Sequence, residues 1–128
     1  MSWPAEITMT SAAVTPVQLA LFAAASGDHN PLHLDPEVAR RAGFERPLVH
    51  GMLTMALAGR LLTDRLGVGC VHMLHTRFTG VAWVGDSLEL HATLEREADG
   101  LAHYTLRGVT GRGSEAITGT AIVGPPRR

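Results

Sequence analysis

Residues Gly51 to Leu66 read GMLTMALAGRLLTDRL, the longest apolar stretch with helical spacing in the chain. Apolar side chains fall on nearly every side of a helix built from these residues, a pattern typical of a helix that protein covers all round. Gly67 follows as a helix stop. We therefore expect a buried central helix whose first turn, at Gly51, also lies inside the molecule.

The second half of the chain changes from the helical period to that of strands. Apolar and polar residues alternate from Leu88 to Glu95, and Asp99-Gly100 is typical of a tight hairpin turn. Further strands are expected over residues 101–110 and 115–123, with a short opening strand near Ile7. A helix-rich first half before an antiparallel sheet predicts an α+β fold. A sheet that wraps round the single apolar helix is the simplest way to bury both.

Two shorter helices are expected before the central one. A threonine cap at Thr15, followed by proline, predicts a helix that runs to about Ser26. An aspartate cap at Asp35, also followed by proline, predicts a second helix that ends by Gly43. Between them lies a tight polar loop of residues 27–34.

The length of 128 residues predicts one domain, residues 1–128, with a disordered tail at 124–128 and no room for a cofactor domain. The net charge of -1 does not provide the positive surface that binding to nucleic acid requires. All 11 basic residues are arginine, so Schiff-base and P-loop lysine chemistry are excluded.

The single cysteine, Cys70, cannot form an internal disulfide, and its apolar neighbours indicate a half-buried thiol. The residues after Met1 lack the pattern of a signal peptide. Arg60 interrupts the longest apolar helical stretch, so we expect no membrane-spanning segment. These features predict a soluble, cytoplasmic protein that binds neither membrane nor nucleic acid.

The polar loop carries a carboxylate and two imidazoles within the sequence Ser26-Gly-Asp-His-Asn-Pro-Leu-His33. Asn30-Pro31 favours a turn that would bring the side chains of Asp28 and His33 together. A carboxylate and an imidazole that share one water molecule form a general acid/base pair. The alternative is that Asp28 caps a turn and His33 is a core histidine with satisfied hydrogen bonds.

The segment from Phe22 to His33, followed by Asp35, resembles the active loop S/G-D-x-N-P-x-H of the MaoC-like (R)-specific enoyl-CoA hydratases. The resemblance continues through FERPLVHGML at residues 44–53 and through Val-Gly-Asp at 84–86, and it covers about residues 15–123. It implies a hotdog fold, usually a homodimer with active sites near the interface. It also implies a hydro-lyase that adds water reversibly and syn to a trans-2-enoyl thioester.

By this resemblance Asp28 would deprotonate the water that attacks C3, and His33 would deliver a proton to C2. The backbone N–H of Gly51 would stabilise the enolate oxygen, as expected for the first residue of a buried helix. His50 would either support the turn or face the substrate. Asn30 would hold the loop. The acyl thioester is carried by CoA or acyl carrier protein, and no cofactor is implied.

Substrate contacts are predicted for Asn30 and His50 and for three apolar residues near the loop or the helix start, Phe22, Met52 and Met55. No metal is expected, although the chain has seven histidines. The closest pair, His72 and His75, falls on a predicted strand, where residues three apart face opposite sides.

Two other functions are open on the same scaffold, since fold alone does not determine activity. One is a hotdog thioesterase, which would use a carboxylate near the helix without needing the Asp-x-Asn-Pro-x-His loop. The other is a non-catalytic subunit that binds acyl thioesters, which the presence of both Asp28 and His33 disfavours.

Overall fold

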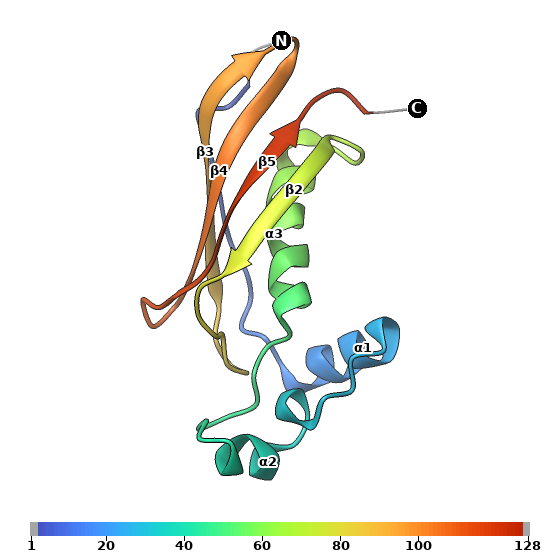
Figure 1. Cartoon of the computed structure of the whole chain (residues 1–128), viewed down its shortest axis with the longest axis vertical. Coiled ribbons are helices and arrows are strands. Elements are labelled where there is room, and N and C mark those ends of the chain that lie inside the picture. The colour runs from blue at the N-terminus through green and yellow to red at the C-terminus, as the bar shows by residue number, and fades with distance from the viewer. Residues whose placement is uncertain (1–2, 127–128) are drawn as a thin grey trace.

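The computed structural model describes residues 3–126 and contains a five-stranded antiparallel sheet and one long helix, α3, packed along it (Figure 1). The strands are β1 (Glu6–Thr10), β2 (Val71–Phe78), β3 (Leu88–Ala98), β4 (Leu101–Thr110) and β5 (Glu115–Val123). The helices are α1 (Pro16–Ser26), the 3-10 turn η1 (Pro31–His33), α2 (Pro36–Arg41) and α3 (Gly51–Leu66). This confirms the predicted α+β class and the hotdog arrangement.

The helix starts follow the predicted caps. Thr15 Oγ1 accepts a hydrogen bond from the backbone N–H of Gln18 at 3.1 Å, which opens α1. The Asp35 carboxylate accepts one from the N–H of Glu37 at 2.9 Å, which opens α2. The sequence did not predict η1.

The strands lie in the order β1-β3-β4-β5-β2, so β1 and β2 form the two edges of the sheet. The hairpin between β3 and β4 turns at Asp99 and Gly100, whose φ angles are 55° and 76°. These positive values explain the Asp-Gly pair, because such conformations are costly for most other residues.

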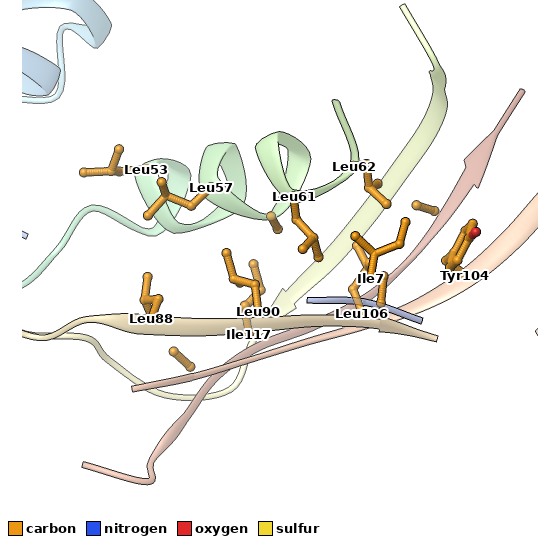
Figure 2. Close-up of a cluster of buried hydrophobic side chains, with 14 of the residues drawn as sticks. Ile7, Leu53, Leu57, Leu61, Leu62, Leu88, Leu90, Tyr104, Leu106 and Ile117 are labelled. Carbon is orange, nitrogen blue, oxygen red and sulfur yellow. The ribbon is translucent and has the colours of Figure 1, made fainter. Parts of the chain in front are cut away.

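The core lies between α3 and the inner face of the sheet (Figure 2). Leu57 and Leu61 point from the helix toward the sheet, where Leu90 and Ile117 lie. Glycine at 108 makes room on β4, because a Cβ there would lie 2.6 Å from Ile117 Cγ2 and 2.9 Å from Leu90 Cδ2.

The expectation that protein covers α3 all round is wrong for the single chain. One face of the helix packs on the sheet, but Met52 is 58% exposed, and Ala56 and Arg60 are exposed on the opposite side. Residues four apart lie on one face of a helix, so these three form an open stripe. The stripe includes two apolar side chains, which is why the sequence did not reveal it.

The predicted disorder of the tail is wrong for Gly124 to Pro126. The N–H of Gly124 donates to the carbonyl of Cys70 at 2.9 Å. His72 Nε2 lies 2.7 Å from the carbonyl oxygen of Pro125, which can only accept. Two hydrogen bonds therefore hold these residues, one to Cys70 just before β2 and one to His72 within it. Arg127 and Arg128 lie outside the described residues.

Helices α1 and α2 lie beyond the first turn of α3, at the end of the molecule opposite the β3–β4 hairpin (Figure 1). The loop between them therefore reaches the start of the central helix. Within residues 3–126, no helix combines the length and the apolar character needed to cross a membrane.

Candidate active site

The loop after α1 folds back on itself through its own side chains. Gly27 ends the helix with a φ of 79°, and the N–H of Asp28 then donates to Ser26 Oγ at 3.1 Å. Asp28 Oδ1 accepts from the N–H of Asn30 at 3.3 Å, and Asn30 Oδ1 accepts from the N–H of Leu32 at 3.0 Å. These consecutive turns reverse the chain, as asparagine and aspartate side chains commonly do.

The reversal brings the side chains of Asp28 and His33 together, as predicted. Asp28 Oδ2 lies 3.7 Å from His33 Nε2, and the two side chains are 51% and 14% exposed respectively. This separation is too long for a direct hydrogen bond, but one water molecule can lie about 2.8 Å from both atoms. Because the carboxylate is open to solvent, the pair is accessible to water and to a substrate.

A backbone carbonyl determines which nitrogen of His33 faces Asp28 as an acceptor. His33 Nδ1 lies 2.8 Å from the carbonyl oxygen of Leu48, which can only accept, so Nδ1 carries the hydrogen. In the neutral ring Nε2 is then the lone-pair nitrogen, and it is the atom nearest the carboxylate. Leu48 is itself held in place, because its N–H donates to the carbonyl oxygen of Leu32 at 3.0 Å and because it forms an antiparallel β-bridge with Trp83.

Gly51 is the first residue of α3, which follows His50 as the cap. Within residues 3–126 the Gly51 N–H has no hydrogen-bond partner. The first N–H groups of a helix carry partial positive charge and attract developing negative charge. This amide is therefore free to donate a hydrogen bond, and its role as an oxyanion donor stays a prediction.

The His50 side chain is buried, with 1% of its surface exposed. Its Nε2 donates to the backbone carbonyl of Asp28 at 3.1 Å, and its ring stacks on that of His33 with centroids 3.9 Å apart and 22° between planes. The ring of Phe22 meets it edge-on at 4.8 Å. The imidazole thus lies beneath the acid/base pair and contacts both members of it.

The other residues predicted to contact substrate differ in their exposure and in what they pack against. Asn30 is exposed and closes the turn of the loop, as expected of a residue that holds it. Met52 is exposed beside Gly51, whereas Met55 is half-buried against the core. Phe22 packs on His50. Contact between these side chains and substrate stays a prediction.

A pocket of about 350 Å³ borders the His33 ring between α1 and the segment before α3. Apart from His33, its lining is apolar: Pro16, Leu19, Ala20, Leu34, Pro36, Pro47 and Val84. Leu19 is among the apolar residues that the sequence suggests for the floor of the acyl pocket, whereas it gives no indication of the other six. Their order along the chain carries no periodic signal, because they come from separate elements.

Asp86, of the predicted Val-Gly-Asp turn, supports the segment beside Leu48. Its buried carboxylate accepts two hydrogen bonds from Arg112, both 2.9 Å, and one from the N–H of Trp83 at 2.8 Å. Burial opposes ionisation of Asp86, but the bonds from Arg112 and Trp83 outweigh it and lower the pKa of the carboxyl. The Arg112 guanidinium also lies 4.0 Å from the centroid of the Trp83 ring.

Asp28, His33 and His50 also place three potential metal-ligand atoms within 4.8 Å of one another. One nitrogen of each ring already donates to a backbone carbonyl, which leaves one lone pair per ring. The expectation that the chain holds no metal was argued from His72 and His75 and did not consider this cluster. It stays a prediction.

The sequence matches the MaoC-like domain family over residues 5–110. An (R)-specific enoyl-CoA hydratase from Aeromonas caviae is 42% identical over 113 residues, which are 85% of this chain and 84% of that protein. The solved (R)-hydratase from A. caviae, described as involved in PHA biosynthesis, has a TM-score of 0.88 and 35% identity, with 98% of each chain covered.

A solved R-hydratase from Pseudomonas aeruginosa also has a TM-score of 0.88, at 28% identity, and the match covers all of this chain and 84% of that one. Other relatives are longer. The match to an enoyl-CoA hydratase of Mycobacterium tuberculosis is 40% identical over 77 residues but spans 27% of that protein's length.

Proposed function

Because the chain belongs to the MaoC-like domain family, we propose that it is an (R)-specific enoyl-CoA hydratase, a hydro-lyase that also dehydrates 3-hydroxyacyl thioesters. The observation that carries this proposal is the separation of 3.7 Å between Asp28 Oδ2 and His33 Nε2. Two groups that can each accept a proton, and that one water can contact together, are what addition of water to a polarised double bond requires.

In the proposed reaction, the pair removes a proton from the bound water as its oxygen bonds to C3 of a trans-2-enoyl thioester. The electrons of the C2–C3 double bond move to the thioester oxygen, giving an enolate. The proton is then returned to C2. In His33 the nitrogen that can exchange this proton is Nε2, because the hydrogen on Nδ1 is donated to the carbonyl of Leu48. One pair serves both carbons from one side, so the addition is syn.

The Gly51 amide is proposed to hold the enolate oxygen. This donor is fixed by the helix before the reaction begins, so it stabilises the charge as it forms without reorganisation. The chemistry proposed here needs one acid/base pair and one oxyanion donor, and it uses neither a redox cofactor nor a metal.

We take CoA as the carrier because the relative that matches over 84% of its own length is named an enoyl-CoA hydratase. We further propose a homodimer in the cytoplasm. The unpaired edge strand β2, with Met73 and Phe78 exposed on it, supports dimer formation, as does Met52 on the open face of α3. The molar mass from light scattering would test the assembly.

The activity is tested with crotonyl-CoA by two readings on one sample, the absorbance of the conjugated enoyl thioester and the release of free thiol. Loss of the absorbance without thiol release is the expected result. Thiol release would support a thioesterase, and neither signal would support a binding subunit; either outcome contradicts the proposal. A parallel assay with crotonyl-acyl carrier protein tests the carrier, because a preference for that substrate would overturn the assignment of CoA.

A further inference from the structure

We propose that His50 is a positioning residue, which holds Asp28, His33 and the Gly51 amide in one geometry without touching substrate. The inference rests on the proposed hydratase function for its kinetic meaning. Of the two predicted roles, support for the turn and contact with the substrate, it takes the first and specifies which groups are held.

The first support is the hydrogen bond from His50 Nε2 to the Asp28 carbonyl oxygen, 3.1 Å long. The hydrogen bonds that fold the loop are local and involve exposed groups, so none of them fixes the loop against α3. The bond from His50 spans 22 residues and joins the main chain of Asp28 to the cap of that helix. It therefore sets where the carboxylate lies relative to the Gly51 amide.

The second support is the stack between His50 and His33. The rings lie 3.9 Å apart with 22° between their planes, and the edge contact with Phe22 restrains His50 further. His33 is thus held by two independent constraints, the bond from Nδ1 to Leu48 and the face of the His50 ring. Both constraints act on the direction in which Nε2 points.

The third support is a polar atom that reduces stability. His50 Nδ1 is buried and has no hydrogen-bond partner among residues 3–126. An unpaired buried polar atom destabilises the folded protein, and an apolar ring of similar shape would avoid that loss. Stability therefore does not explain a histidine at this position. The hydrogen bond from its Nε2–H to the carbonyl of Asp28 does.

Two variants separate the functions of the ring. His50→Phe keeps a flat ring to stack on His33 but lacks the donor to Asp28. His50→Gln loses the stack but places an amide N–H near the position of Nε2. We expect His50→Phe to lower kcat with crotonyl-CoA by about 10- to 100-fold, the scale of a small misplacement of reacting groups, with little change in KM or in the melting temperature. His50→Gln should recover at least half of that loss on a logarithmic scale.

A double-variant comparison gives an independent check. In an Asp28→Asn background the carboxylate that His50 positions is already lost, so adding His50→Phe should reduce the residual rate by less than about 3-fold. A full multiplicative loss would contradict positioning through Asp28. So would a rise in KM with unchanged kcat, which would indicate a substrate contact, or a kcat for His50→Phe within about 3-fold of wild type.

Hydrogen exchange supplies a reading that does not depend on turnover. The N–H groups of Asn30, Leu32 and His33 should exchange faster in His50→Phe than in wild type or His50→Gln, while those of β4 stay unchanged. Equal exchange in all three proteins would overturn the inference. A wild-type protein without hydratase activity would overturn the proposed function instead, and the exchange result would still decide the role of His50.

Discussion

The ring of Phe78, on β2, lies directly against the backbone of Gly51 at the start of α3. A methyl group at residue 51 would be 3.1 Å from both Cε2 and Cζ of that ring. The contact leaves little room for a side chain at this position, and it places an aromatic surface beside the proposed oxyanion donor. The phenylalanine is half exposed, so its ring can move by a few tenths of an ångström.

The Gly51 amide can be tested by removing the N–H and little else. Proline suits the first position of a helix, and the φ and ψ of His50, -55° and 133°, suit the residue before a proline. Gly51→Pro should lower kcat by about 100- to 1000-fold, the effect of losing one oxyanion donor. Gly51→Ala is the matched control, because it also meets Phe78 but keeps the donor. Equal losses in both variants would mean that crowding, and not the hydrogen bond, is responsible.

The acid/base pair predicts two further variants. Asp28→Asn and His33→Gln should each lower kcat for hydration of crotonyl-CoA by at least about 100-fold, because each removes one proton acceptor from the shared water. Asp64→Asn and His91→Gln are controls of the same chemical change at exposed sites, on α3 and β3 respectively. Circular dichroism should show all four folded. Near-normal turnover in Asp28→Asn or His33→Gln would contradict the assignment.

Much of this fold could be predicted because its signals are local. Caps and stops at Thr15, Asp35 and Gly67 mark helix ends through hydrogen bonds within a few residues. The Asp99-Gly100 turn marks the β3–β4 hairpin through backbone conformation alone. The open face of α3 was missed because periodicity shows where apolar groups lie on a helix, and not how many neighbours the chain provides to cover them.

The site was predictable in its residue types but not in its geometry. The spacing of Asp28 and His33 suggested that they meet, and they do. Their orientation depends on the carbonyl of Leu48, which is 15 residues from His33 and has no side-chain signal. The contact of Phe78, on β2, with Gly51, on α3, could not be predicted either. Contacts between residues far apart in the chain leave no pattern in a single sequence.

The Asp86–Arg112 pair predicts a pH-dependent stability. The folded pKa of Asp86 is below its unfolded value, so its contribution is present above about pH 4 and is lost as the pH falls through the folded pKa. Asp86→Asn should lower the free energy of unfolding by about 2 kcal/mol at pH 7 and should flatten the decline of this free energy below about pH 4. Urea unfolding at a series of pH values measures both effects.

For that comparison Asp64→Asn is again the control, because it breaks an exposed pair with Arg60. Such pairs contribute little to stability, and its pH profile should follow that of wild type. A wild-type slope in the Asp86 variant would show that other carboxyls account for the acid sensitivity.

Two glycines predict opposite effects of the same substitution. Gly108→Ala should destabilise the protein by about 1–3 kcal/mol, because the new Cβ would collide with Ile117 and Leu90 in the core. Gly59→Ala should stabilise it by about 0.5–1 kcal/mol, since the residue is inside α3 and the nearest atom, Leu74 Cδ2, would be 3.7 Å away. Thermal unfolding of both variants beside wild type measures the two effects, and a lower melting temperature for Gly59→Ala would contradict the second prediction.

The termini of the described chain lie far from the reacting groups. Trp3 and Pro126 line one pocket together with Leu66, the last residue of α3, whereas the loop of Asp28 and His33 adjoins its first residue. A helix of 16 residues separates these ends by about 24 Å. Polypeptide attached at either end would therefore begin far from the loop that carries Asp28 and His33. A domain with this layout can be carried inside a longer protein without the added chain crossing the loop of Asp28 and His33, which fits the small share that the matching segment occupies in a longer relative.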